Sequence, residues 1–423
     1  MKNKITITEM MRATRALRDE GRHFTHIGVG PMSYNLLRAA LELAQEKRFP
    51  LILIASRNQV DSDRFGGGYV CGFDQKRFVG ATDKIAEEIG FDGLCYFCRD
   101  HGGPWQRDKE RSDKLPVEEA MEIGYESYID DIKAGFDLLH IDPTKDPHCS
   151  GVVPLSTVLE RTIRLIEKIE AARRENGWKE IAYEVGTEET MGGLIDPKVF
   201  EDFIRALKAE LEKKGLPMPL FVVGQTGTLT RLTSNVGHYD TPTATNLSNI
   251  THRYGTGLKE HNGDYLANRI LLEHPVIGLD AMNVAPEFGL VETEALLELS
   301  AIEDKFIAAE KRSGVRAALA KHAVEGERWR KWMVGDKREA SVAEIMKNEE
   351  DVQLITKMCG HYTLEDAEVK SAVARLNENI ASLGLQPQRY VVKKIKDSID
   401  RYIYCFNLYG VSDELIAKAE KLS

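Results

Sequence analysis

Residues 181–224 read IAYEVGTEETMGGLIDPKVFEDFIRALKAELEKKGLPMPLFVVG, and this stretch predicts a strand, a helix and a second strand. The apolar runs at 181–186 and 220–224 have the length of buried strands. Between them, Asp196 is placed to cap a helix that starts at Pro197 and ends before Gly215. One apolar stripe marks the buried face of that helix: Phe200, Phe203, Ile204, Leu207 and Leu211. Two strands joined by a helix predict parallel pairing through a right-handed crossover.

The same alternation of strand and helix continues in both directions along the chain. We predict eight strands in all: 25–30, 51–56, 95–99, 138–142, 181–186, 220–224, 257–261 and 278–284. Helices fill the gaps, including one that begins near Pro154 and one that runs from Asp264 to just before Pro275. Eight such units favour a closed (β/α)8 barrel, the TIM barrel, over an open α/β sheet. No strand is followed by the glycine pattern of a dinucleotide or P-loop site, which argues against a nucleotide-binding fold and a sugar kinase.

The chain is predicted to have two parts. The barrel is expected to occupy residues 1–314, because the strand pattern fades from about Val315 onward. Residues 315–423 predict a helical C-terminal extension, with apolar positions in segments such as 390–406 (YVVKKIKDSIDRYIYCF). Two alternatives stay open: the extension packs on the barrel, or it packs on a neighbouring subunit.

Composition and charge indicate an ordinary globular chain of the cytoplasm. It is 42% hydrophobic and 29% charged, and it has neither an apolar run of membrane-spanning length nor a secretory signal at its N-terminus. A formal net charge of −10 disfavours nucleic acid as a partner. The six cysteines do not form a disulfide pattern. The C-x-x-C of Cys95 and Cys98 has no second pair at zinc-ribbon spacing, which disfavours a cysteine metal site.

Polar side chains gather at the carboxyl ends of the predicted strands, where barrel enzymes place their sites. Six of them would converge on the barrel mouth: Asp100, His101, Asp142, Glu184, Gln225 and His261. Imidazole nitrogens with carboxylate or amide oxygens suit a divalent ion such as zinc, and a carboxylate beside a ligand histidine suits proton transfer. Taken singly, each residue has a structural alternative. Asp264, for example, is expected to cap the seventh helix.

Further residues at the strand ends suit substrate binding. A glycine-rich loop at 65–68 (FGGG) follows the second strand, and its backbone N–H groups, with Arg57, could hold a phosphate group. His140 lies two residues before Asp142 and therefore on the same face of the fourth strand. The candidate substrate-binding residues are Arg57, Asn58, Gln59, Gly67, His140 and Asn283.

Together these segments resemble the GatZ/KbaZ family, the Z subunits of tagatose-1,6-bisphosphate aldolase. That family is similar in turn to the class II, zinc-dependent ketose-bisphosphate aldolases. The resemblance runs from the second strand to the end of the eighth helix and covers most of the barrel. It rests on six stretches: Asn58-Gln59-Val60 with the glycine loop, 100–104 (DHGGP), Gly135-Phe136 with His140-Ile141-Asp142, 183–188 (YEVGTE), Glu260-His261 with Asp264-Tyr265, and Arg312-Ser313-Gly314.

The resemblance implies roles for single residues. Asp100 and His101 match a pair in which the aspartate handles a proton and the histidine binds zinc. His261 matches a zinc histidine after a later strand, and Glu184 matches the glutamate of an E-x-G segment. At the sixth strand those aldolases carry a further zinc histidine in an A-H-G sequence, whereas this chain has Gln225 followed by Thr-Gly. Three outcomes stay open: Gln225 and Glu184 complete the metal site, the metal binds weakly, or no metal binds.

The resemblance implies a metal-dependent enzyme, with zinc as the expected ion, that acts at C3–C4 of a ketohexose phosphate. Tagatose or fructose 6-phosphate and the 1,6-bisphosphates are the candidate substrates, and the reaction is either C4 epimerisation through retro-aldol cleavage and re-addition or aldol cleavage alone. The expected catalytic residues are Asp100, Glu184 and Asp142. The expected metal ligands are His101, His261, Gln225 and Glu184. The chain is expected to form a homo-oligomer, and a Y-type aldolase subunit is a second candidate partner. The alternative function is a non-catalytic Z-type subunit that stabilises a class II tagatose-bisphosphate aldolase.

Overall fold

Eight parallel strands close into a barrel in the computed structural model, which describes residues 3–187 and 194–423. Hydrogen-bonded neighbours follow the order β1-β10-β9-β6-β5-β4-β3-β2 around the barrel. The strands are β1 (His26–Val29), β2 (Leu51–Ser56), β3 (Cys95–Gly102), β4 (Leu138–Ile141), β5 (Ala182–Gly186), β6 (Phe221–Val223), β9 (Gly257–Glu260) and β10 (Ala281–Val284). Each lies at a predicted position, so the (β/α)8 prediction is confirmed. Glu188, the last residue of the YEVGTE stretch, lies outside the described residues.

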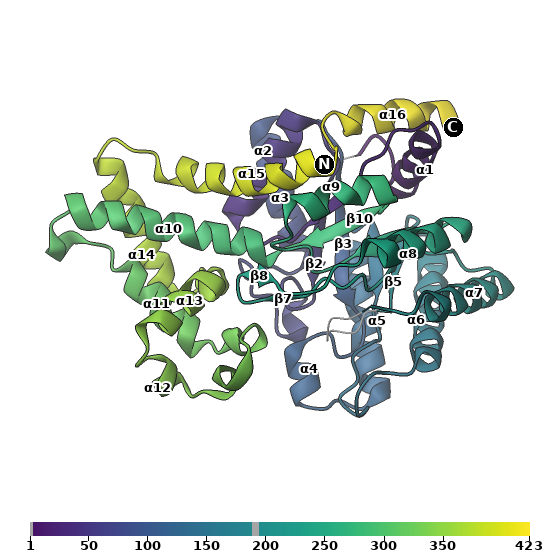
Figure 1. Ribbon diagram of the computed structural model, residues 1–423, viewed down its shortest axis with the longest axis horizontal. Helices are drawn as coiled ribbons and strands as arrows, with labels where there is room; N and C mark the ends of the chain where they lie inside the picture. Colours follow the sequence, from purple (N-terminus) through teal and green to yellow (C-terminus); the bar gives the residue numbers. More distant parts are fainter. Residues whose placement is uncertain (1–2, 188–193) are drawn as a thin grey trace.

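Helices surround this barrel (Figure 1). They are α1 (Ile7–Asp19), α2 (Tyr34–Lys47), α3 (Gln75–Ile89), α4 (Asp108–Ser112), α5 (Val117–Ala134), α6 (Leu155–Glu175), α7 (Pro197–Lys214), α8 (Thr241–Arg253), α9 (Asn268–Ile277) and α10 (Pro286–Phe306), with the short 3-10 helix η1 (Asp63–Phe65). A two-stranded antiparallel hairpin of β7 (Thr230–Arg231) and β8 (Ser234–Asn235) lies in the loop after β6 and was not predicted. No helix of the described residues is long and apolar enough to span a membrane.

The α7 helix forms as its sequence predicts. The Asp196 side chain accepts hydrogen bonds from the backbone N–H groups of Lys198 and Val199, and Pro197 occupies the first turn. Gly215 ends the helix in the left-handed region at φ 62°. The buried residues of the helix are the five of the predicted stripe: Phe200, Phe203, Ile204, Leu207 and Leu211. The α6 helix likewise begins directly after Pro154, as predicted.

The seventh helix of the barrel differs from its prediction at both ends. It begins at Asn268 rather than at Asp264, and it continues through Pro275 to Ile277. Pro275 has no N–H to donate to the carbonyl of Leu271, and the helix ends within three residues of it, at Gly278. The Asp264 carboxylate is turned instead toward the next loop, where it accepts hydrogen bonds from the N–H groups of Ala285 and Glu287 at 3.0 and 2.8 Å. Asp264 therefore caps α10 and not α9.

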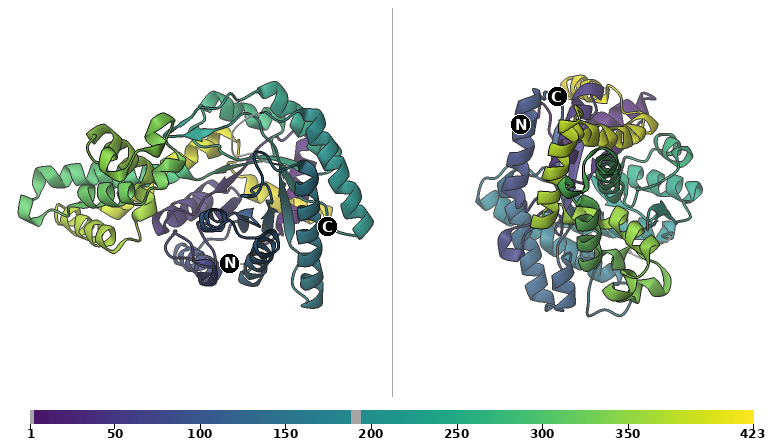
Figure 2. Two further views of the ribbon diagram at one scale, coloured as in Figure 1. Left: turned by 90° about the horizontal axis from the view of Figure 1, so that it is seen from below. Right: turned by 90° about the vertical axis from the view of Figure 1, so that its left-hand side faces the viewer.

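The C-terminal part is helical, as predicted. It contains α11 (Val315–Glu325), α12 (Val342–Ile345), α13 (Glu349–Cys359), α14 (Ala367–Ser382), α15 (Pro387–Cys405) and α16 (Val411–Leu422), with the 3-10 helices η2 (Ala309–Lys311), η3 (Arg328–Lys331), η4 (Gly335–Glu339) and η5 (Gly360–Thr363). We call residues 315–382, from α11 through α14, the C-terminal lobe. Figures 1 and 2 show this lobe to one side of the barrel, with α10 running out to it.

The chain then returns from the C-terminal lobe to the barrel. Helix α15 packs against α2 and α10, and α16 packs against α1. Buried residues of α14, α15 and α16 belong to the same hydrophobic core as the barrel strands. The extension thus packs on the barrel of its own chain, which is one of the two alternatives left open by the sequence. The boundary at residue 314 stays a prediction. All six cysteines are free thiols, in line with the absence of a predicted disulfide pattern.

A three-histidine cluster at the barrel mouth

Asp100 and His101 lie at an irregularity near the end of β3. The register between β3 and β4 shifts between Arg99 and Gly102, and His101 has a positive φ of 44°. Adjacent residues of a regular strand point to opposite faces, so both side chains could not reach the barrel mouth from an unbroken strand. The bulge allows both to lie near one imidazole. Asp100 Oδ1 is 3.7 Å and His101 Nε2 is 3.1 Å from ring nitrogens of His261.

Three imidazoles meet at this point: His101 from β3, His140 from β4 and His261 from the end of β9. One ligand nitrogen from each lies within 4.8 Å of the others. The ring centroids of His101 and His261 are 4.7 Å apart, and that of His140 lies 5.3 and 5.2 Å from them. His140 is fully buried and His261 is 4% exposed, which leaves His101 as the ring nearest to solvent.

Carboxylates fix the orientation of two of these rings. Asp142 Oδ2 lies 2.6 Å from His101 Nδ1, and Glu184 Oε1 lies 3.0 Å from His261 Nε2. These contacts turn His101 Nε2 and His261 Nδ1 toward each other at 3.1 Å. Two nitrogens bound to one zinc ion at about 2.0–2.1 Å would stand slightly farther apart, about 3.3 Å for a tetrahedral angle. The spacing therefore fits a shared divalent ion after a small relaxation.

His140 contributes the third imidazole. Its Nδ1 accepts a hydrogen bond from the backbone N–H of His101 at 3.1 Å, and its buried Nε2 has no hydrogen-bond partner. Gly186 at the end of β5 makes room for this ring, because a Cβ there would lie 2.7 Å from His140 Nε2. One ring nitrogen of His140 lies within 4.8 Å of a ring nitrogen of each of the other two histidines, a spacing that a shared ion could bridge. The three residues fit a divalent metal ion.

Lys259 forms a buried ion pair with Glu184. It lies on β9 two residues before His261, and its Nζ donates to Glu184 Oε2 at 2.6 Å. Lys259 is 3% exposed and Glu184 is fully buried. Lys259 was not predicted as a site residue, although its spacing of two from His261 places both on the same face of one strand.

The electrostatics of the cluster favour ionised carboxylates and a neutral His140. Burial lowers the pKa of His140 to about 4. For Asp142 and Glu184 burial alone would raise the pKa, but the hydrogen bond from His101 and the charge of Lys259, respectively, hold it well below the usual range. Burial likewise opposes the ionisation of Asp100, and the neighbouring histidines outweigh it and lower its pKa. A neutral imidazole beside carboxylates is the state that binds a cation.

Asn283 and Asp100 form a second pair at the mouth. The Asn283 Nδ2 donates to Asp100 Oδ1 at 3.0 Å, while its Oδ1 is buried with no partner. Asp100 is thereby held near all three rings, at 3.7 Å from His261 and 4.0 Å from His101 and His140. Asp100 is the carboxylate best placed to move a proton without being one of the two that orient the rings.

The other predicted residues lie around the cluster or support its loops. Gln225 follows β6 and is half-buried, and its carbonyl accepts from the N–H of Ile195. Gln59 accepts from the N–H of Ser56 and donates to Met32 Sδ at 3.2 Å. Gly67 has a φ of 63° in the glycine-rich loop.

Two residues after β2 are engaged within the scaffold. The Arg57 guanidinium is fully buried and bonded to Asp61 and Glu110 at 3.0 Å. This differs from its predicted role in phosphate binding, because a phosphate would need a guanidinium with free donors at the surface. Asn58 Nδ2 donates to the carbonyl of Gln106, and its Oδ1 accepts from the N–H of Asp108. Asn58 thus ties this loop to the start of α4.

The fold and the site define a (β/α)8 barrel protein with a histidine–carboxylate centre at the carboxyl ends of its strands. The family model of D-tagatose-1,6-bisphosphate aldolase subunit GatZ/KbaZ-like proteins matches residues 11–391. The chain therefore belongs to the GatZ/KbaZ-like family, which confirms the resemblance found in its sequence and relates it to tagatose-bisphosphate aldolase.

Solved structures share the fold. A probable tagatose 6 phosphate kinase from Sinorhizobium meliloti 1021 has a TM-score of 0.75 at 22% identity, over 91% of this chain and 100% of that one. The fructuronate-tagaturonate epimerase UxaE from Cohnella laeviribosi has a TM-score of 0.56 at 12% identity, over 91% and 82%. The fructose-bisphosphate aldolase Fba from Campylobacter jejuni has a TM-score of 0.53 at 11% identity, over 96% of each chain.

Proposed function

We propose that this protein is a metal-dependent enzyme that acts at C3–C4 of a ketohexose phosphate, either by C4 epimerisation through retro-aldol cleavage and re-addition or by aldol cleavage. One observation carries the proposal: three imidazoles and an independently held Asp100 meet at the barrel mouth. Membership in a tagatose-bisphosphate aldolase family supports the substrate class. The barrel of an epimerase of related sugar acids and that of a fructose-bisphosphate aldolase are similar in fold.

His101, His140 and His261 would hold the ion, with zinc as the first candidate because of the imidazole donors. His140 then takes the place of the sixth-strand histidine of class II aldolases, and Gln225 is left as a neighbour or a weak fourth ligand. A bound divalent ion would supply Lewis-acid polarisation of the substrate carbonyl oxygen. Asp142 and Glu184 keep the ligand nitrogens of His101 and His261 facing inward.

Asp100 would take the proton from the C4 hydroxyl oxygen and return it when the bond re-forms. Asn283 orients Asp100 through Nδ2 and offers an unpartnered Oδ1 to a substrate hydroxyl. For epimerisation both fragments must stay in the site, and re-addition must use the opposite face of the aldehyde.

The second candidate function is a non-catalytic Z-type subunit that stabilises a Y-type aldolase. The specific observation in its favour is Gln225, which stands where class II aldolases carry a zinc histidine. A polar cluster of this kind is costly to bury without a ligand, so we place the enzyme first.

The deciding experiment uses the full-length chain without any partner. We load it with zinc, incubate it with fructose 6-phosphate, and separate tagatose 6-phosphate and triose products by chromatography. Asp100→Asn should abolish product and keep the metal content of the wild type. If the metal-loaded wild type forms no product alone but raises the activity or solubility of a Y-type subunit, the accessory function is correct instead.

A further inference from the structure

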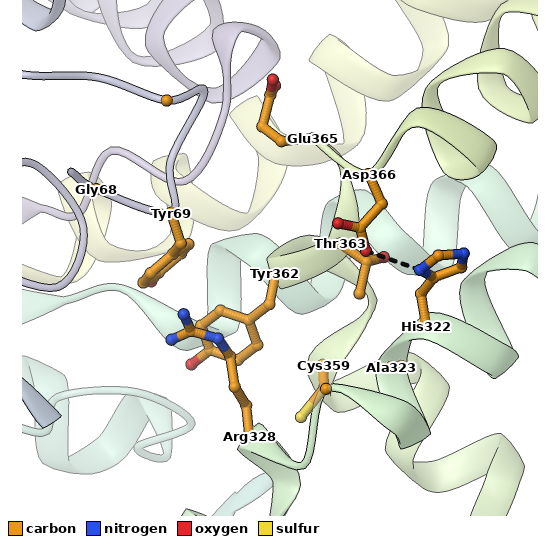
Figure 3. Close-up of a pocket in the computed structure, with 12 residues that line it drawn as sticks. Gly68, Tyr69, His322, Ala323, Arg328, Cys359, Tyr362, Thr363, Glu365 and Asp366 are labelled. Carbon is orange, nitrogen blue, oxygen red and sulfur yellow. Dashed lines mark ion pairs between the residues drawn. The ribbon is translucent and has the colours of Figure 1, made fainter. Parts of the chain in front are cut away.

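A separate pocket of about 340 Å³ lies between the loop after β2 and the C-terminal lobe. Gly68 and Tyr69 line it from the barrel side (Figure 3). His322, Arg328, Tyr362 and Asp366 line it from the lobe. None of the three clustered histidines is among its lining residues, and small-molecule sites commonly occupy cavities of this size where two parts of a chain meet.

Arg328 is the notable side chain of this pocket. Its guanidinium carbon lies 4.6 Å from the ring centroid of Tyr69 and 5.2 Å from that of Tyr362. These two rings are themselves packed edge to face at 4.9 Å. Within the described residues no carboxylate forms an ion pair with Arg328 and no acceptor bonds it. A guanidinium fixed by aromatic faces, with its N–H donors uncommitted, is prepared to bind an anion.

The acidic residues of the pocket do not take up this charge. Asp366 Oδ2 lies 3.0 Å from His322 Nδ1, the ion pair drawn in Figure 3. Glu365 is paired with Lys370. Both carboxylates thus have a partner other than Arg328, and Arg328 has no acidic partner among the described residues.

Further positive charge lies close to the same carboxylate as Arg328. Lys145, Arg111, Arg328 and Lys331 come from three separate segments, and all of them act on the single carboxylate of Asp108. Such crowding of cations in a chain of net charge −10 is relieved when an anion binds among them.

The barrel side of the pocket is closely packed. A Cβ on Gly68 would lie 2.0 Å from the carbonyl oxygen of Gln59, so only glycine permits this path of the loop. Tyr69 follows directly, and its hydroxyl donates to Met32 Sδ at 3.9 Å. The aromatic wall next to Arg328 is therefore fixed by the glycine-rich loop for which the sequence predicted phosphate binding.

We propose that this pocket binds a small phosphorylated metabolite, with the Arg328 guanidinium holding the phosphate and the Tyr69 and Tyr362 rings lying against its carbon skeleton. The inference goes beyond the proposed function, because binding here does not require the histidine cluster to be catalytic. The phosphate could belong to a substrate that reaches the barrel mouth or to a separate effector molecule.

Calorimetric titration of the full-length chain tests the site with fructose 6-phosphate as the probe and fructose as its unphosphorylated counterpart. Arg328→Met should weaken fructose 6-phosphate binding by at least about tenfold, since it removes charge-assisted hydrogen bonds to phosphate. Arg330→Met is the matched control. Arg330 lies on the same turn but is paired with Glu327 at 2.5 Å, so its loss should change affinity less than about twofold.

Titration of His101→Ala separates the two sources of the phosphate. Weakened binding in both His101→Ala and Arg328→Met indicates one substrate that spans mouth and pocket, whereas unaltered binding in His101→Ala indicates a separate effector. Either result supports the site. The proposal is overturned if Arg328→Met binds fructose 6-phosphate like the wild type, or if fructose binds as tightly as its phosphate.

A second measurement uses only wild-type protein and so does not depend on a folded variant. Phenylglyoxal labels accessible arginines, and peptide mass spectrometry reports each position. Inorganic phosphate should protect Arg328 and leave Arg330 labelled. Equal labelling of Arg328 with and without phosphate would contradict the proposal.

Discussion

At the scale of single residues, His140 changes the interpretation of the site. The sequence predicted His140 as a substrate contact, on the same strand face as Asp142. In the folded barrel it stands beside His101 and His261, where a ligand histidine is otherwise missing. Linear spacing could not show this, because the three residues come from three strands and their convergence depends on the tilt and register of the barrel.

We expect His140→Ala to reduce zinc affinity by about a hundredfold or more, as His101→Ala and His261→Ala should, because each removes one of the three proposed ligands. Zinc affinity is measured by competition with a chelator. His252→Ala is the control, since His252 bonds Asp280 at 2.7 Å outside the cluster and should keep the wild-type value. Unchanged affinity in His140→Ala would return the third position to Gln225. In that case Gln225→His should tighten binding.

Gly186→Ala tests the packing of the same ring from the other side. The added methyl would meet His140 Nε2 at 2.7 Å and force the imidazole away from its neighbours. We therefore expect zinc affinity to fall at least about tenfold. Gly80→Ala on α3 is the matched control, because a Cβ there meets nothing within 4 Å. If Gly186→Ala keeps both zinc affinity and activity, His140 is not confined as described.

At the scale of elements, the sequence was most informative where local rules act alone. All eight strands and the caps of α7 follow from apolar runs, Asp196 and Gly215. Features that depend on a neighbouring element were missed: the β3 bulge that aims Asp100 and His101, the pairing of Lys259 with Glu184, and the turn of Asp264 toward α10. Asp264 lies more than twenty residues before α10 in the sequence, so the residues at the start of that helix give no sign of the side chain that caps it.

The α10 cap leads to a pH prediction. Burial raises the pKa of Asp264 from 3.8 to about 7. The folded chain then holds a proton that the unfolded chain releases, so this group's contribution to stability is full below about pH 4 and is lost as the pH rises through 7. Asp264→Asn keeps the oxygen acceptor but cannot titrate.

Urea unfolding of wild type and Asp264→Asn between pH 4.5 and 8 measures this effect. The stability of the wild type relative to the variant should decrease as the pH rises and level off above about pH 7. Asp397→Asn, at an exposed position on α15, should show a constant difference. A constant difference for Asp264→Asn as well would mean that its carboxylate ionises normally in the folded chain.

At the scale of the whole molecule, some C-terminal helices share the hydrophobic core of the barrel, whereas other C-terminal residues form a separate core. Helices α14, α15 and α16 share the barrel core, while Trp329, Ile355 and Met358 belong to a second, smaller core inside the C-terminal lobe. Backbone bonds tie the end of the chain to the barrel, with Thr25 N–H donating to Phe406 and Ser412 N–H donating to Arg48. The last two helices therefore pack on the outside of the barrel, against α1, α2 and α10.

This arrangement predicts that damage to α16 destabilises the barrel itself. Leu415 is fully buried on α16, and Leu415→Ala should lower the free energy of unfolding by about 3 kcal/mol through lost burial and the remaining cavity. Leu422, on the same helix and 40% exposed, is the matched control, and Leu422→Ala should cost well under about 1 kcal/mol.

Far-UV circular dichroism in urea follows the helices of the whole chain, and zinc retention follows the barrel mouth. Because α16 packs on α1 and shares the barrel core, both signals should shift together to lower urea in Leu415→Ala. If zinc is retained to the wild-type urea concentration while part of the helical signal is lost earlier, α16 unfolds on its own and the barrel does not depend on it.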